Sequence, residues 1–383
     1  MTRLPDAPWG IYVHIPFCQA KCSYCAFVSQ VGNEKLQQEY VAALCREITA
    51  AGGDFSAHSV DSLFFGGGTP TVLQTDALAL ILQTIRDNFS LSGDAEISIE
   101  ANPGTVTGES LATLRRQGFN RLSLGVQSFD DKVLAVIGRV HRAEDAETAF
   151  GLARRAGFDN IGLDLIYGLP LQTVASWQST LEQAVMLNPD HLSAYGLKME
   201  EGTPLAAAVE NGLEILPSGA DEEAMYDQLN LFLPVAGFDR YEIANYAKPG
   251  RQCRHNLKYW RSLPFRGFGL AAHSFNGTQR FANIDNLTEY LQRAESGQSV
   301  VLPPEETDEA TLIAEYAFTA LRLVEGLCYE EFQRRFNRDF CRIYAAALQR
   351  LVEQELIVQT DQAVFLTPRG MKFGNQVFAD FLP

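Results

Sequence analysis

The sequence predicts an α/β protein with a parallel sheet, and three observations lead to this class. Short apolar runs alternate with amphipathic helical stretches from residue 9 to about residue 200. Polar or glycine-rich residues follow most of these runs. The chain has 383 residues, 46% of them hydrophobic and 20% charged, enough for one large domain and a smaller appended one. Such alternation implies right-handed crossovers, but periodicity alone leaves open a doubly wound sheet, a full barrel or a partial barrel.

Six strands and five crossover helices are predicted in this first part of the chain. The strands are Trp9–Pro16, Asp61–Phe65, Glu96–Glu100, Arg121–Val126, Asn160–Ile166 and His191–Leu197. Apolar positions that recur every three or four residues predict the helices between them. These helices are Leu36–Ala50, Thr75–Asn88, Gly108–Arg116, Ala143–Ala156 and Val174–Leu187.

The regular alternation weakens after about residue 200. Residues 240–283 are rich in aromatic side chains, Gly and Pro, and residues 301–307 (VLPPEET) have the composition of a linker. Helices are then predicted over Thr311–Leu323 and Tyr344–Gln354, followed by a strand pair, Leu356–Thr360 and Val364–Thr367. We expect three segments: 1–240, an aromatic- and Gly-rich bridging segment at 241–300, and 301–383. The last is a smaller, mainly helical, winged-helix-like domain that serves as a packing or lid domain.

Charge and hydropathy narrow the classes of partner. The formal net charge is −16, with 31 basic and 47 acidic residues, so the overall field repels phosphate backbones and nucleic acid is not expected as a partner. The opening MTRLPDAPWG does not look like a signal peptide, and no apolar run has membrane-spanning length. We expect a cytoplasmic protein; peripheral membrane association and a homodimer remain open.

Residues that do not suit a core gather where the predicted strands end. In parallel α/β proteins the carboxyl ends of the strands form the ligand site, so these residues are expected to converge. They are Cys18, the run Gly66–Pro70, the run Glu100–Pro103, the pair Gln127 and Ser128, and Asp164 with Tyr167 and Gly168.

Three cysteines, Cys18, Cys22 and Cys25, form a CxxxCxxC motif, whereas the other four are scattered. This pattern is typical of a metal site in a reducing compartment rather than of a disulfide framework. Structural zinc requires four ligands, and no fourth follows at zinc-finger spacing. Three thiolates suit a cubane iron-sulfur cluster with one open iron; a zinc or thiol-redox protein is the alternative.

The segment YVHIPFCQAKCSYC at 12–25 resembles the signature of radical S-adenosylmethionine (radical SAM) enzymes. Further motifs narrow the resemblance to the branch that contains oxygen-independent coproporphyrinogen III oxidase. They are GGGTP at 66–70, EANP at 100–103, GVQSF at 125–129, GRVH at 138–141 and DLIYGLP at 164–170. The resemblance implies a partial parallel (β/α)6 barrel, a 4Fe-4S cluster on Cys18, Cys22 and Cys25, and S-adenosylmethionine as cofactor.

The resemblance also implies roles for individual residues around the cofactor. Glycines allow the backbone to approach a ligand, carboxylates accept hydrogen bonds from ribose hydroxyls, and an arginine can clamp a carboxylate. The residues that match cofactor-contacting positions are Tyr12, Tyr24, Gly67, Gly68, Thr69, Pro70, Glu100, Gln127, Arg139 and Asp164. Gln127, Arg139 and Asp164 match positions that serve a second cofactor molecule in the oxidase, so one or two molecules are expected.

Two departures from the oxidase point to another function. The oxidase carries a further cysteine two residues after the third cluster cysteine, where this chain has Phe27. The string HNLKYW at 255–260 resembles the mark of haem chaperones related to the oxidase. An imidazole can ligate iron and aromatic rings can cover a porphyrin, which implies haem contacts at His255, Tyr259, Trp260 and Cys253. A hydrogen-bonded structural histidine is the alternative for His255.

The predicted function is therefore a haem chaperone that carries a 4Fe-4S cluster and S-adenosylmethionine and passes haem, its cargo, to client apoproteins. The alternative is a radical SAM oxidoreductase that decarboxylates coproporphyrinogen III. Coproporphyrinogen oxidase activity is not expected, and the sequence leaves open whether the chain is an enzyme at all.

Overall fold

Seven parallel strands form the centre of the main sheet. The computed structural model describes residues 7–55, 58–304 and 306–382. Among these residues the main sheet has 11 strands in the order β11-β10-β9-β1-β2-β3-β4-β5-β6-β8-β7. The parallel strands are β1 (Trp9–Ile15), β2 (Ser59–Gly67), β3 (Ser90–Ala101), β4 (Arg121–Gln127), β5 (Ile161–Tyr167), β6 (His191–Gly196) and β9 (Phe265–Phe268).

Short antiparallel strands extend both edges of this sheet. They are β7 (Asp239–Arg240) and β8 (Asn245–Ala247) beside β6, and β10 (His273–Phe275) and β11 (Arg280–Ala282) beside β9. The edge strands β11 and β7 do not pair with each other, so the curved sheet is an open barrel. This agrees with the predicted partial barrel, although β9 adds a seventh parallel strand that the sequence did not predict.

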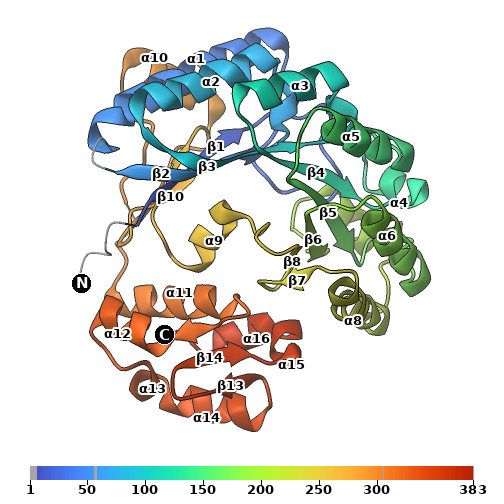
Figure 1. Cartoon of the computed structure of the whole chain (residues 1–383), viewed down its shortest axis with the longest axis vertical. Helices are drawn as coiled ribbons and strands as arrows, with labels where there is room; N and C mark the ends of the chain where they lie inside the picture. Colours follow the sequence, from blue (N-terminus) through green and yellow to red (C-terminus); the bar gives the residue numbers. More distant parts are fainter. Residues whose placement is uncertain (1–6, 56–57, 305, 383) are drawn as a thin grey trace.

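Helices cover the outer face of the sheet, and one helix, α9 (Arg254–Trp260), packs against β2 on the inner face (Figure 1). The other described helices before residue 300 are α1 (Glu34–Ala51), α2 (Thr75–Asn88), α3 (Gly108–Gln117), α4 (Asp131–Val136), α5 (Ala143–Arg155), α6 (Val174–Met186), α7 (Pro204–Glu210), α8 (Gly219–Val235) and α10 (Leu287–Ser296). Short 3-10 turns occupy Gly52–Phe55, Pro70–Val72 and Pro103–Thr105. All five predicted crossover helices are present; α4 was missed because it has only 6 residues.

Local sequence explains why the crossover helices begin where they do. The side chains of Asn33, Thr107, Thr173 and Ser218 accept hydrogen bonds from backbone N–H groups in the first turns of α1, α3, α6 and α8. Such N-caps satisfy donors that have no partner inside the helix. The apolar side of each helix then packs on the sheet and forms the main core.

The C-terminal part of the chain has its own core. It contains α11 (Glu309–Leu321), α12 (Tyr329–Phe336), α13 (Phe340–Ile343), α14 (Ala345–Glu353), α15 (Pro368–Lys372), α16 (Gly374–Ala379) and the strands β12 (Leu327–Cys328), β13 (Ile357–Gln359) and β14 (Ala363–Leu366). These strands form a separate sheet in the order β12-β14-β13. The predicted hairpin is present, and β12, which has 2 residues, is an addition to it.

Residues 241–300 contribute strands and a helix to the main sheet. They supply β8 to one edge of the main sheet, β9, β10 and β11 to the other, and α9 to its inner face. The segment boundaries at residues 240 and 300 stay a prediction. In the described part of the chain, no helix combines the length and the apolar character needed to cross a membrane.

Candidate functional site

The three motif cysteines lie in the loop that leaves β1, which we call the cysteine loop (residues 16–33). Its neck is closed by backbone hydrogen bonds from Cys18 N to Gln30 O (3.0 Å) and from Gln30 N to Pro16 O (2.8 Å). All three thiols are half-buried and free of disulfides. Burial raises the pKa of the Cys25 thiol, and the neighbouring Cys22 and Cys18 raise it further, so the three sulfurs are electrostatic neighbours.

The thiols are not already arranged around a common point. Among the described residues, no three His, Cys, Asp or Glu side chains form a ready metal-binding group. The donor set nevertheless suits a thiolate-ligated cluster, because one loop carries three soft ligands beside a cation. That cation is Arg139, whose Nη1 donates to Cys22 Sγ at 3.5 Å.

The glycine-rich end of β2 fits tightly under the cysteine loop. Gly68 N donates to Ile15 O (2.8 Å) and Thr69 N donates to Phe17 O (2.7 Å). A Cβ atom on Gly68 would meet Phe17 O at 2.6 Å, so only glycine fits there. Gly67 has φ +108, and a Cβ there would meet the His14 ring at 2.5 Å. Both the backbone conformation and the close contact therefore require glycine at this position. Pro70, which follows Thr69, begins a short 3-10 turn.

Arg139 connects the cysteine loop to the ends of β3 and β4. Besides Cys22, its guanidinium donates to Asn102 Oδ1 (2.6 Å) and to the Gly125 carbonyl. Asn102 in turn donates to Thr69 Oγ1 (2.9 Å), and Thr69 donates to Cys18 Sγ (3.6 Å). These bonds link Cys22 to Cys18 through the side chains of Arg139, Asn102 and Thr69.

Two half-buried carboxyl groups, Glu100 on β3 and Asp164 on β5, lie inside the barrel. Burial raises the pKa of Glu100 to about 8, and the neighbouring Asp164 adds to this shift. Burial likewise raises the pKa of Asp164, which accepts hydrogen bonds from Ser123 Oγ at 3.1 and 3.2 Å. Gly67 N donates to Glu100 Oε2 at 3.3 Å, which places Glu100 directly at the glycine-rich strand end.

The remaining predicted cofactor residues border the same region. Gln127 ends β4 after a register shift and has φ +67, a conformation that costs energy for a residue with a side chain. Tyr24 packs against an apolar cluster of Val133, Ile137, Ile166 and Leu169. Tyr12 lies on β1, and its hydroxyl is 3.1 Å from His14 Nδ1.

The HNLKYW segment forms α9, and its setting differs from the one predicted for haem ligands. His255 and Cys253 have no exposed surface. Both ring nitrogens of His255 are engaged, Nδ1 with Ser62 Oγ at 3.1 Å and Nε2 with Tyr259 Oη at 2.9 Å. Burial, with smaller contributions from Lys258 and Arg121, lowers the pKa of His255 to about 3, so the ring is neutral. As placed, this histidine has no free nitrogen for iron.

Phe27, at the position of the additional oxidase cysteine, points away from the core with 68% of its surface exposed. A phenyl side chain supplies no ligand to a metal. The cysteine loop therefore offers three thiolates and no fourth.

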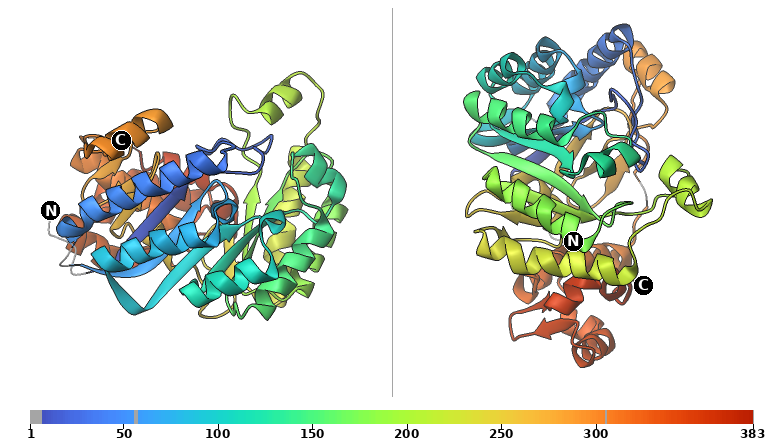
Figure 2. Two further views of the ribbon diagram at one scale, coloured as in Figure 1. Left: turned by 90° about the horizontal axis from the view of Figure 1, so that it is seen from above. Right: turned by 90° about the vertical axis from the view of Figure 1, so that its right-hand side faces the viewer.

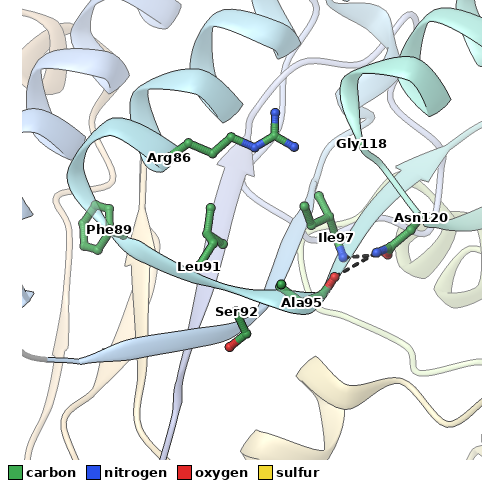
Figure 3. A pocket seen from close by; sticks show the side chains of 9 residues that line it. Arg86, Phe89, Leu91, Ser92, Ala95, Ile97, Gly118 and Asn120 are labelled. Atoms are coloured by element: carbon green, nitrogen blue, oxygen red, sulfur yellow. Dashed lines mark hydrogen bonds between the residues drawn. The ribbon is translucent and has the colours of Figure 1, made fainter.

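A separate pocket of about 430 Å³ lies at the opposite, N-terminal end of the sheet (Figure 3). Residues that line it include Arg86, Leu91, Ile97 and Asn120. The Asn120 side chain is occupied by hydrogen bonds with Ile97 N and Ala95 O, both 2.8 Å. None of the predicted site residues lines this pocket, and the convergent polar groups lie at the carboxyl ends of the strands.

Sequence reasoning missed several residues that hold this site together. Asn102 was seen only as part of the EANP strand end, and Ser123 and His14 were not assigned a role at the site. His14 Nε2 lies 2.9 Å from Val28 O and so holds the cysteine loop to β1. Leu205 N, at the start of α7, donates to Ser23 O (2.8 Å), and Figure 2 shows α7 standing out from the barrel. Only Asn102 carried a sequence signal, its place directly after a strand.

Comparison with known proteins agrees with this geometry. Residues 12–184 match the family described as Radical SAM superfamily, and residues 308–373 match the one described as HemN C-terminal domain. The solved structure of coproporphyrinogen III oxidase (HemN) from Escherichia coli, described as a radical SAM enzyme, superposes with a TM-score of 0.86 and 28% identity. That superposition covers 99% of this chain and 91% of the oxidase. Fold and sequence together define a protein of the radical SAM superfamily.

Relatives that match this chain over nearly its whole length narrow the assignment within this superfamily. A Bacillus subtilis (strain 168) protein named Heme chaperone HemW is 36% identical over 376 residues, which cover 97% of this chain and 98% of the relative. A Synechocystis protein of the same name is 35% identical over 97% of this chain and 96% of its own length. The one from Escherichia coli (strain K12) is 39% identical over 71% of each chain. The chain belongs to the HemW family, which confirms the predicted family and fold class.

Proposed function

We propose that this protein is a haem chaperone that binds haem and passes it to client apoproteins. The observation that carries the proposal is the match, over nearly the full length of both chains, to proteins named Heme chaperone HemW. The oxidase is the less similar of the two classes of relative, at 28% identity. The absence of a fourth cysteine beside Cys25, where Phe27 stands, further supports a chaperone over an oxidase.

Cys18, Cys22 and Cys25 would hold a 4Fe-4S cluster through their thiolates. Such a cluster with one open iron can chelate S-adenosylmethionine and supply an electron to it. Arg139 would offset part of the negative charge that three thiolates bring, because its guanidinium already donates to Cys22 Sγ. The bonds through Asn102 and Thr69 would hold the loop in position.

S-adenosylmethionine would lie over the carboxyl ends of β1 to β5. Gly67 and Gly68 would let the methionine part approach the backbone, Thr69 and Pro70 would border it, and the carboxyl groups of Glu100 and Asp164 would take up ribose hydroxyls. Tyr12 and Tyr24 would flank the cofactor. Gln127, Arg139 and Asp164 would serve a second molecule if one binds, which a binding stoichiometry of two would demonstrate.

The proposal includes haem contacts at His255, Tyr259, Trp260 and Cys253. The family resemblance supports them, whereas the burial and hydrogen bonds of His255 oppose them. For His255 to ligate iron, α9 would have to leave the barrel interior or the bond to Tyr259 would have to break.

One experiment separates the two candidate functions. Anaerobically reconstituted protein with S-adenosylmethionine and reductant is divided between a haem titration followed by absorbance and an assay for coproporphyrinogen decarboxylation with 5′-deoxyadenosine as co-product. Saturable haem binding and transfer to an apoprotein without decarboxylation is the expected result. Decarboxylation in proportion to 5′-deoxyadenosine would overturn the proposal.

The cluster assignment has its own test. Cys22→Ser should abolish the iron-sulfur absorbance while haem binding remains measurable, because the proposal places haem on residues outside the cysteine loop. Cys341→Ser, in the C-terminal part of the chain, is the matched control and should keep the full iron and sulfide content. Simultaneous loss of cluster and haem in Cys22→Ser would contradict separate sites.

A further inference from the structure

We propose that α9 is an internal support, which braces β1 from inside the barrel and positions Tyr12 and His14 under the cysteine loop, and that His255 is a positioning residue rather than a haem ligand. The inference rests on the proposed cluster and S-adenosylmethionine site. It assigns to the HNLKYW motif a task that the buried, hydrogen-bonded side chains of His255 and Lys258 can perform.

The start of α9 is held inside the barrel by β1, β2 and β3. Glu96 on β3 accepts hydrogen bonds from Arg254 N (3.2 Å) and His255 N (3.4 Å). On β1, Gly10 lies so close to the helix that a Cβ there would meet Lys258 Cδ at 2.7 Å and His255 Cε1 at 3.0 Å. Lys258 Nζ is 2.6 Å from Asp61 and donates to Pro8 O at 2.7 Å.

The His255 ring contacts aromatic rings of β1 and β2, and through them the position of α9 affects β1. Tyr12 and Phe64 are register partners on β1 and β2, with ring centroids 6.3 Å apart. The His255 ring lies 5.6 Å from Phe64 and 6.4 Å from Tyr12, nearly parallel to both. Tyr12 therefore has the helix on one side, and the hydrogen bond of its hydroxyl with His14 on the other.

The same face of β1 leads to the cysteine loop. Successive side chains of a strand alternate between faces, so Gly10, Tyr12 and His14 share the inner face. His14 contacts the loop at Val28 O and lies where a Cβ of Gly67 would be. Three alternate residues of one strand thus connect α9 with the loop and the glycine-rich strand end.

The other end of α9 is seated on the C-terminal part of the chain. The guanidinium of Arg322, the residue that follows α11, lies over the Trp260 ring, 4.3 Å from its centroid. Arg335 of α12 donates to Arg261 O at 3.3 Å, and Ser262 Oγ lies 3.0 Å from Thr319 Oγ1. Because both ends of the helix are fixed, α9 can act as a brace rather than as a mobile ligand arm.

Two variants test the inference, one on α9 itself and one on β1, where the helix packs. His255→Gln removes the ring, and Gly10→Ala leaves every histidine intact but places a methyl group where His255 and Lys258 pack. Both should weaken S-adenosylmethionine binding to the reconstituted protein by about tenfold, the lower end of what loss of an outer supporting contact costs. Both should also speed hydrogen exchange in residues 12–31 of the protein without cluster. The Soret band and haem affinity should match those of the parent protein.

Two controls and one contrary pattern complete the test. Gly219→Ala, whose Cβ meets nothing within 4 Å, and His273→Gln, on an exposed side chain, should leave cofactor affinity and exchange unchanged. Two results together would overturn the inference: His255→Gln loses the absorbance band of an axial haem ligand, and hydrogen exchange is unchanged in both His255→Gln and Gly10→Ala. If the parent protein bound no S-adenosylmethionine, the proposed function would fail, but hydrogen exchange would still test the support.

Discussion

The charge state of Glu100 is set by where its side chain lies. The carboxyl group is partly buried beside Asp164, and desolvation raises its pKa to about 8. The neutral form therefore predominates near pH 7 in the chain without ligands, and it can donate as well as accept a hydrogen bond. The partly buried carboxyl group of Glu100 lowers the stability of the folded protein but suits a polar ligand, and such a trade-off is common at binding sites.

Glu100→Gln is expected to change how stability depends on pH. Below the unfolded pKa of 4.5 both states are protonated; as the pH rises toward 8, the unfolded chain ionises first and the native state loses stability. Gln should remove this loss, which is on the order of 2–4 kcal/mol at high pH. Urea unfolding at several pH values between about 5 and 9 measures it. The exposed Glu201→Gln serves as control, and an unchanged pH slope in Glu100→Gln would contradict the prediction.

Gly68→Ala should damage the site through contact alone. Its Cβ would meet the carbonyl oxygens of Phe17 and Ile15 at 2.6 and 2.9 Å, and backbone atoms cannot move aside without shifting the cysteine loop. We expect a loss of about 1–3 kcal/mol in unfolding free energy and reduced iron incorporation. Gly93→Ala, which meets nothing within 4 Å, should change neither quantity. If Gly68→Ala and the parent protein had equal iron contents, the close fit between Gly68 and the cysteine loop would be refuted.

At the scale of elements, the position of α9 is decided by strands far away in sequence. The helix has 7 residues, too few for a stable helix in isolation. Its Lys258, 3% exposed, forms an ion pair with Asp61 of β2. Buried ion pairs contribute little net stability, but removal of one partner leaves a costly charge.

Lys258→Met should therefore lower the unfolding free energy by about 2–3 kcal/mol, less than for a fully buried pair because Asp61 is 27% exposed. The double variant Lys258→Met with Asp61→Asn should recover part of this loss, since no unpaired charge remains. Denaturant unfolding of the single and double variants gives the coupling energy. Strictly additive losses would show that the pair does not interact as described.

At the scale of the whole molecule, two cores share the chain. The main core fills the layer between the barrel strands and their helices, and the second lies among α11–α16 and their small sheet (Figure 1). Phe332 has no exposed surface and its ring centre lies 4.9 Å from Phe336 and 5.0 Å from Phe340. This aromatic group is the centre of the C-terminal core.

Phe332→Ala is expected to unfold the C-terminal part first, since the truncation costs about 3–5 kcal/mol in a single small core. Limited proteolysis should then cut beyond residue 301, while hydrogen exchange in β1–β6 stays slow. Phe373→Ala, on a ring that is 43% exposed, is the control and should leave the cleavage pattern unchanged. Simultaneous loss of protection in both parts would show one cooperative unit.

The sequence by itself determined the order of the first six strands and the five long helices between them, the cysteine loop and the polar strand ends, because these depend on local periodicity and on residues close together in the chain. It could not supply β9, since a 4-residue strand is specified by its partner β1, about 250 residues earlier. Nor could it decide whether His255 is a ligand or a packed side chain. Only the tertiary structure shows what surrounds the ring, because its burial and the contact of Nδ1 come from Ser62, Phe64 and Tyr12, which long-range strand pairing brings to α9. Nε2 contacts Tyr259 of the same helix.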